Sequence, residues 1–234
     1  MNKNIQEVVA IIDRSGSMIG KESDTIGGIN STFEVLKSSL KDNDEVKVSI
    51  KLFDHEEKLL IRSLNLNQVR PIESHQYIPR GQTALYDAIG NSLTYFMEKK
   101  LLNPNAYNKC LIYVVTDGLE NSSKKYNSLT LKNLIENAKD KYGIEIIYLA
   151  ANQDAILEAS KIGINLEHAL NFTESSENSM GAYRCAASVA NRQRSGSNTA
   201  FTQEERSQSY GISTPPPSKR SSEPPPLRRK RSSI

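Results

Sequence analysis

Three oxygen-bearing side chains follow an apolar run near the start of the sequence. Asp13, Ser15 and Ser17 stand at alternate positions directly after residues 8–12, which are all apolar. An apolar run with β-branched residues is typical of a strand buried on both faces. In open α/β sheets, ligands gather outside the carboxyl ends of such strands, and carboxylate and hydroxyl oxygens suit a hard cation. The spacing therefore indicates part of a cation site.

Two further segments carry comparable donors. The apolar run 110–115 ends in Thr116 and Asp117, and Thr83 stands at the start of a predicted helix. Carboxyl ends of parallel strands and the helix starts that follow them face one edge of a sheet. We therefore expect five side chains to converge there: Asp13, Ser15, Ser17, Thr83 and Asp117.

The elements that must position these residues alternate along the chain. Apolar periodicity predicts strands at 8–13, 46–52, 110–115, 144–150 and 169–172, and helices at 24–40, 85–101, 129–141, about 152–161 and 176–194. Residues 58–62 are expected to pair antiparallel with 46–52 across a short turn. Residues 64–79 predict a loop or a very short helix. The predicted fold class is α/β: a doubly wound, mostly parallel sheet flanked by helices, with one antiparallel edge strand.

The composition changes beyond about residue 195. Ser, Gln, Arg and Pro dominate residues 195–234, which predicts a disordered tail after a folded domain of residues 1–194. Residues 215–234 carry six Lys/Arg against one Glu, so the net charge of +3 leaves −2 for the first 214 residues (+3 minus +5). Basic tails bind nucleic acid in some proteins and are merely solvated in others.

The two cysteines and the apolar runs bear on the cellular compartment. Cys110 opens an apolar run and Cys185 lies among alanines, so both are predicted to be buried thiols, which fits a reducing compartment. The N-terminal residues lack a secretory apolar core, and no run approaches the ~20 apolar residues of a membrane helix. We expect a soluble, cytoplasmic protein with no membrane segment.

Taken together, the loop Asp13-Arg14-Ser15-Gly16-Ser17, the isolated Thr83 and the aspartate of Thr116-Asp117-Gly118 resemble a known family. This is the von Willebrand factor A (VWA) domain, a Rossmann-like fold with a metal-ion-dependent adhesion site (MIDAS). The resemblance covers about residues 5–194, and the segment 148–154 is similar to stand-alone bacterial or phage members.

The resemblance implies a ligand set and a function. Ser15, Ser17 and Thr83 would coordinate a divalent cation through their hydroxyls, and Asp13 and Asp117 would act directly or through water. Mg²⁺ (Mg2+) or Mn²⁺ is expected in preference to Ca²⁺. Neutral hydroxyls with only two carboxylates leave the ion electron-poor and one position open. We thus expect a non-enzymatic adaptor that captures a partner protein's Asp or Glu through the cation.

Two alternatives remain open. A metal-assisted hydrolase would need a general base, for which Asp87 and Glu120 are the candidates. An adaptor whose basic tail also binds nucleic acid is the other. A phosphate-binding loop at 16–22 is disfavoured, because the glycine spacing is one residue short and Glu22 replaces the required Ser or Thr. Surface or loop positions are predicted for His55, His75 and His168.

Overall fold

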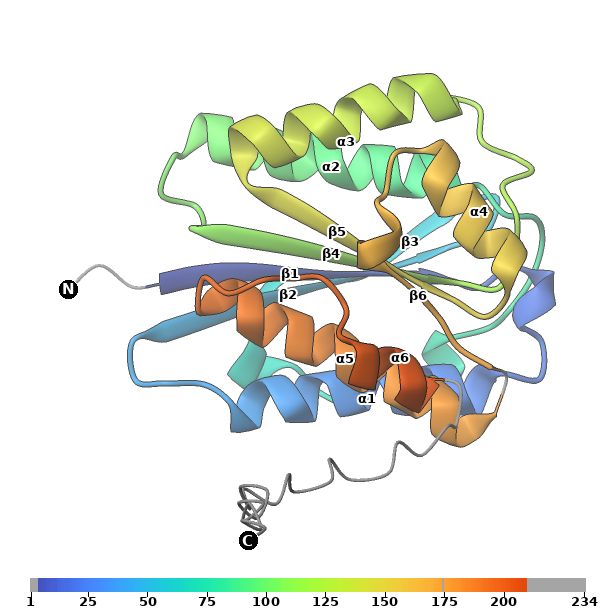
Figure 1. Ribbon diagram of the computed structural model, residues 1–234, viewed down its shortest axis with the longest axis horizontal. Helices are drawn as coiled ribbons and strands as arrows, with labels where there is room; N and C mark the ends of the chain where they lie inside the picture. The colour runs from blue at the N-terminus through green and yellow to red at the C-terminus, as the bar shows by residue number, and fades with distance from the viewer. Residues whose placement is uncertain (1–3, 174, 210–234) are drawn as a thin grey trace, which may run out of the picture.

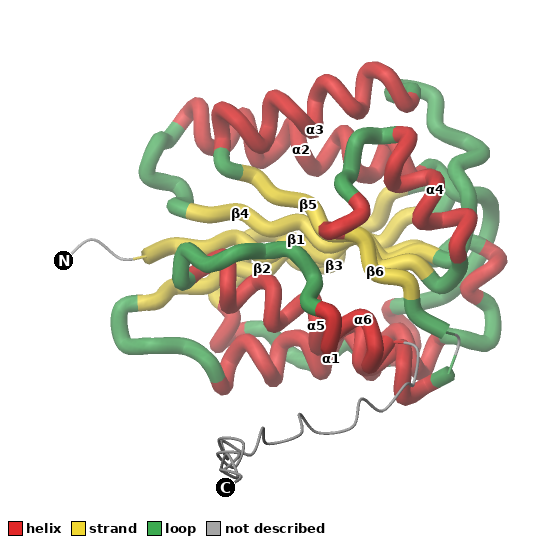
Figure 2. The backbone as a smooth tube through the Cα atoms, viewed as in Figure 1, coloured by secondary structure: helices red, strands yellow, loops and turns green. Residues whose placement is uncertain are grey.

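The computed structural model describes residues 4–173 and 175–209, in which one sheet lies between two layers of helices (Figures 1 and 2). The strands are β1 Asn4–Asp13, β2 Asp44–Phe53, β3 Glu57–Asn65, β4 Lys109–Thr116, β5 Ile144–Ala150 and β6 Ala169–Asn171. The α-helices are α1 Glu22–Ser38, α2 Leu85–Leu102, α3 Ser128–Tyr142, α4 Gln153–Lys161, α5 Ser176–Arg194 and α6 Gln203–Ser209. Short 3₁₀ helices are η1 Gly16–Met18, η2 Leu66–Gln68, η3 Ser74–Gln76 and η4 Leu166–His168.

The sheet has the strand order β3-β2-β1-β4-β5-β6. Every neighbouring pair is parallel except β2 and β3, which are antiparallel at one edge. The predicted fold class is confirmed. The strand order reverses at β1, because the chain moves outward to β2 and β3 and then returns to β4 on the other side. The carboxyl ends of β1 and β4 therefore lie side by side, where ligands bind in sheets of this kind.

Helices cover both faces of the sheet, which explains the unbroken apolar runs. In Figure 1, α2, α3 and α4 lie above the sheet, and α1, α5 and α6 lie below it. Alternate residues of β1 enter the two cores: Val8 and Ile12 pack on the side of α1 and α5, and Val9 and Ile11 on the side of α2 and α3. A strand buried on both faces has no polar side, so its sequence does not alternate.

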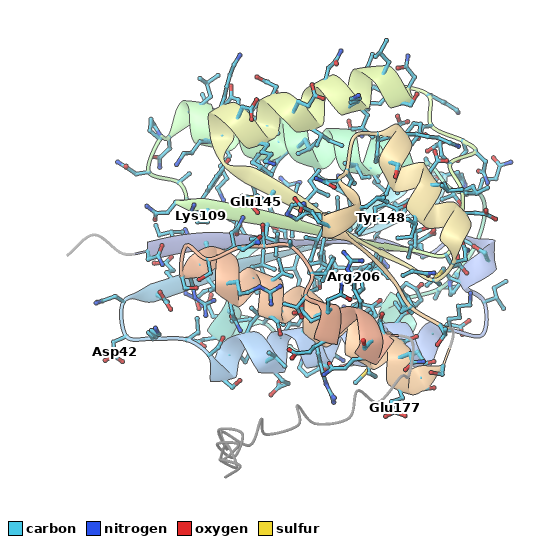
Figure 3. The ribbon with its side chains drawn as sticks, viewed as in Figure 1. Asp42, Lys109, Glu145, Tyr148, Glu177 and Arg206 are labelled. Carbon is cyan, nitrogen blue, oxygen red and sulfur yellow. The ribbon has the colours of Figure 1, made fainter. Side chains whose placement is uncertain are left out.

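The predicted domain end at residue 194 is wrong, because residues 195–209 are folded against the domain. The side chain of Phe201 is 6% exposed. Arg192 forms a bidentate ion pair with Glu205 at 2.8 and 3.0 Å. Arg206 of α6 reaches the edge strand β6 (Figure 3), where it donates to the carbonyl oxygen of Ala169 at 2.9 Å. The composition of residues 195–209 does not predict that they fold, because only one aromatic side chain and two arginines attach them to the domain. The predicted disorder and nucleic-acid binding of residues 210–234 fall outside the described residues and stay predictions.

Both cysteines are buried and free, as predicted. Burial raises the pKa of the Cys110 thiol well above its usual range and that of Cys185 to about 12. Neither thiol is therefore a reactive thiolate at neutral pH. Among the described residues, no helix combines the length and apolarity needed to cross a membrane.

Candidate metal centre

The five predicted donors meet at the carboxyl edge of the sheet. Asp13 ends β1, Ser15 and Ser17 lie between β1 and α1 with Ser17 in η1, Thr83 precedes α2, and Asp117 follows β4. The point that a Cβ atom on Gly118 would occupy is 3.3 Å from Thr83 Oγ1, 3.4 Å from Ser17 Oγ and 3.6 Å from Asp13 Oδ2. Three oxygens from three separate segments therefore converge beside the backbone of Gly118, where a side chain on residue 118 would crowd them.

Hydrogen bonds link the remaining donors to this group. The backbone N–H of Ser15 donates to Asp13 Oδ1 at 2.6 Å, and the hydroxyl oxygens of Ser15 and Ser17 are 3.0 Å apart. The Ser17 hydroxyl donates to Asp117 Oδ1 at 2.6 Å. Asp13, Ser15, Thr83 and Asp117 are buried, whereas Ser17 is exposed. The cluster is thus embedded in the domain and open to solvent on the side of Ser17.

The position of Asp13 depends on contacts that sequence reasoning missed. Thr116, the last residue of β4, donates its hydroxyl hydrogen to Asp13 Oδ2 at 2.5 Å. The buried hydroxyl of Tyr77 donates to the backbone oxygen of Asp13 at 2.6 Å. The sequence places Thr116 at the end of the second strand but does not show that it binds Asp13, and nothing in the sequence marks Tyr77.

Two asparagines hold the other loops. Asn121 forms a two-point contact with Thr83: its side-chain oxygen accepts the Thr83 N–H at 2.8 Å, and its own N–H donates to the Thr83 carbonyl at 3.0 Å. Asn152 donates from Nδ2 to the Asp117 carbonyl at 2.5 Å. The loops after β4 and β5 therefore orient Thr83 and Asp117 before any ligand binds.

A third strand end contributes Asp54, which the sequence analysis treated only as part of a turn. Its carboxylate is fully buried and lies 3.0 Å from the Nε atoms of both Arg14 and Arg80. Its backbone oxygen accepts the N–H of Ala84 at 2.8 Å. Asp54 thus ties the loop of Ser15 and Ser17 to the loop of Thr83. Like Asp117, Asp54 directly follows a strand, but β2 ends one residue beyond its predicted end.

Asp54 also forms an acidic group with His55 and Glu56, whose potential ligand atoms lie within 4.8 Å of one another. The predicted loop position of His55 is confirmed, and its two neighbours in the chain are acidic. The paired guanidinium groups already neutralise Asp54, so this group is a weaker candidate for a cation than the cluster around Gly118.

The electrostatics of the cluster favour a cation. Burial raises the pKa of Asp13 from 3.8 to about 6; the charge of Asp117 adds to this effect, and the hydrogen bonds from Thr116 and Ser15 oppose it. The ammonium group of Lys21 lies 2.5 Å from Asp117 Oδ2. The charges of Asp13 and Asp117 repel each other, and a positive charge between the two carboxylates stabilises both.

Both candidate bases of a hydrolase, Asp87 and Glu120, accept hydrogen bonds from backbone N–H groups. The two carboxylate oxygens of Asp87 accept the backbone N–H groups of residues 124–126 at 2.8–2.9 Å. Glu120 accepts the N–H groups of residues 122–123 through Oε1 and that of Tyr86 through Oε2. Both side chains shape the loop that follows β4, which accounts for their presence beside the site.

The donors around Gly118 fit a divalent cation. They are all oxygens, two of them in carboxylates and three in hydroxyls, and they come from rigid positions at strand ends and a helix start. Mg²⁺ and Mn²⁺ prefer such ligands and a small, well-ordered site. Asp13, Ser15, Ser17, Thr83 and Asp117 would hold the ion.

A doubly wound sheet with an oxygen-donor site at its switch point defines a class of α/β ligand-binding domains. The sequence profile of the von Willebrand factor type A domain matches residues 7–184. The chain belongs to this family, whose domains generally mediate protein–protein interactions. A search of curated protein sequences finds no significant match.

Solved structures show the same fold at low sequence identity. The pilus adhesin SpaC of Lactobacillus rhamnosus GG has a TM-score of 0.59 at 14% identity over 82% of this chain and 31% of its own. The proximal thread matrix protein 1 of the mussel byssus has a TM-score of 0.52 at 15% identity over 82% of this chain and 47% of its own. Manganese-loaded TRAP of Plasmodium vivax has a TM-score of 0.52 at 16% identity over 74% and 70%. This chain thus spans less than half of the first two proteins.

Proposed function

We propose that this domain is a metal-dependent protein-binding module. Asp13, Ser15, Ser17, Thr83 and Asp117 bind Mg²⁺ or Mn²⁺, and a carboxylate of a partner protein completes the coordination of the ion. The observation that carries the proposal is the convergence of Thr83, Ser17 and Asp13 oxygens within 3.6 Å of the empty Cβ position of Gly118.

The composition of the site supports capture of an anionic group. Three of the five donors are neutral hydroxyls, so the protein offers the ion little negative charge, and the ion supplies Lewis acidity for one more ligand. The exposed Ser17 marks the side from which that ligand approaches. The manganese in the similar TRAP structure supports a divalent ion of this kind.

We further propose that the domain binds rather than catalyses and that it works in a reducing, cytoplasmic compartment. The carboxylates of Asp87 and Glu120, the two candidate bases, are engaged by backbone N–H groups, which supports the first statement. The buried free thiols of Cys110 and Cys185 support the second.

Calorimetric titration with Mg²⁺, Mn²⁺ and Ca²⁺ tests the metal site. Thr83→Ala removes a ligand oxygen and is expected to weaken Mg²⁺ binding at least tenfold, roughly the loss of one good polar contact. Thr94→Ala is the matched control, since this α2 hydroxyl donates only locally, to Gly90 O at 2.9 Å, and contacts Tyr126. A wild-type protein that binds none of the three ions would refute the proposal.

Selection of random peptides on the Mn²⁺-loaded domain, with elution by EDTA, tests carboxylate capture. Recovered peptides should share an Asp or Glu whose replacement by Asn or Gln abolishes binding. Peptides without a shared acidic residue, or peptides that EDTA does not release, would contradict this part of the proposal.

A further inference from the structure

A lysine stands where a helix start does not favour one. Lys21 immediately precedes α1 and makes no side-chain cap to the helix. The exposed N–H groups of a helix N-terminus favour Ser, Thr, Asp or Asn and disfavour positive charge. The local structure of α1 therefore gives no reason for a lysine at this position.

The tertiary contact of Lys21 supplies a reason. Its ammonium nitrogen is 2.5 Å from Asp117 Oδ2, and the Asp117 side chain is only 4% exposed. The other oxygen of this carboxylate, Oδ1, accepts the hydroxyl of Ser17 at 2.6 Å. Lys21 thus places a positive charge on the same carboxylate that a bound cation would use, and the two charges must compete for it.

The surroundings of Lys21 offer its ammonium group a second position. A small cavity of about 30 Å³ is bordered by Lys21, Asp24, Thr116 and Asp117. Asp24 stands three residues after Lys21, in the first turn of α1. Its Oδ2 accepts the hydroxyl of Ser176 at 3.0 Å, which fixes the carboxylate beside α5. Lys21 and both carboxylates, Asp24 and Asp117, therefore line the same cavity.

We propose that Lys21 sets the metal affinity of the site by acting as an internal competitor. Its ammonium group neutralises Asp117 in the metal-free protein and moves toward Asp24 when a divalent cation binds. The inference rests on the proposed metal site around Gly118. A cation must displace the ammonium group of Lys21 from Asp117 in order to bind. Lys21 therefore sets the range of cation concentration over which the site fills.

Titration of Mn²⁺ and Mg²⁺ into the full chain tests the competition. Lys21→Met keeps the length of the side chain but removes its charge, and it is expected to tighten binding by about three- to fivefold, the upper part of the range of a partly exposed ion pair. Lys37→Met is the matched control on the same helix: Lys37 lies 3.9 Å from Glu34 and is remote from the site, so its change should stay within about twofold.

A double-mutant cycle with Asp24 tests the second position. Asp24→Asn should weaken metal binding in the wild-type background, because the displaced ammonium group loses its new partner, and should have no effect in the Lys21→Met background. An equal effect of Asp24→Asn in both backgrounds would overturn the proposed movement.

The outcomes separate this inference from the function on which it rests. If the wild type binds metal and Lys21→Met binds with equal or lower affinity, the competition is refuted while the metal site stands. If neither protein binds metal, both proposals fail. Thermal unfolding in EDTA gives a readout independent of metal: Lys21→Met should melt at a lower temperature than Lys37→Met, since Asp117 then lacks its counter-charge.

Discussion

Replacement of Asp13 by Asn is expected to stabilise the metal-free protein, although it removes a proposed ligand. The pKa of Asp13 rises from 3.8 to about 6 because the carboxylate is buried. An acid with a raised pKa binds its proton more tightly in the folded state than in the unfolded state. The contribution of Asp13 to the free energy of unfolding therefore falls as pH rises from 3.8 to about 6, and it is constant above that range.

The size of the effect follows from the shift. About two pKa units at 1.36 kcal/mol each give about 3 kcal/mol of destabilisation by ionised Asp13 at neutral pH. The amide of Asn at position 13 carries no charge, and its oxygen still accepts the N–H of Ser15. Its NH₂ group donates to Thr116 Oγ1 when the Thr116 hydroxyl turns to donate to Gly118 O, which is 3.3 Å away. At pH 7.5 in EDTA, Asp13→Asn should thus be up to about 3 kcal/mol more stable than the wild type.

Urea unfolding at pH 7.5 and pH 4, with EDTA and with saturating Mg²⁺, measures this prediction. The advantage of Asp13→Asn should vanish near pH 4, where the wild-type carboxyl is protonated. Mg²⁺ at 1,000 times its Kd should stabilise the wild type by about 4 kcal/mol and leave the variant unchanged, which reverses their order. Asp42→Asn, in an exposed loop, is the control and should change stability by less than about 0.5 kcal/mol. A metal-free variant less stable than the wild type at pH 7.5 would refute the reasoning.

Three further changes test the site and the fold. Gly118→Ala adds a methyl group 3.3–3.6 Å from three donor oxygens, so calorimetry should show Mg²⁺ affinity lowered at least about tenfold with little change in stability; unchanged affinity would place the ion elsewhere. Lys99→Met leaves the fully buried carboxylate of Glu7 without the ammonium group 2.6 Å away, and urea unfolding should show a loss of about 3–5 kcal/mol; a loss below about 1 kcal/mol would show that Glu7 needs no partner. A chain ending at residue 209 should melt like the full chain, whereas one ending at 194 should lose about 2 kcal/mol with the burial of Phe201; equal melting of both would contradict the fold of residues 195–209.

The fold could be predicted because its local signals agree with the final packing. The apolar runs 8–12 and 110–115 identify strands buried on both faces, and period-3.6 patterns identify the helices between them. Chain direction then assigns the carboxyl ends of the strands to one edge. Asp13 and Asp117 follow directly from this assignment, whereas Asp54 does not, because β2 ends at Phe53, one residue beyond its predicted end.

The sequence by itself determined the sheet, the edge that carries the donors, and the identity of the five side chains that meet there. These features depend on the local pattern of apolar and polar residues and on chain direction, and the sequence contains both. Only the tertiary structure decided that Lys21 lies on Asp117, 96 residues away, and that residues 195–209 belong to the domain. Such contacts depend on how two separately formed elements pack, and a polar side chain has the same local pattern whether it meets a partner or solvent.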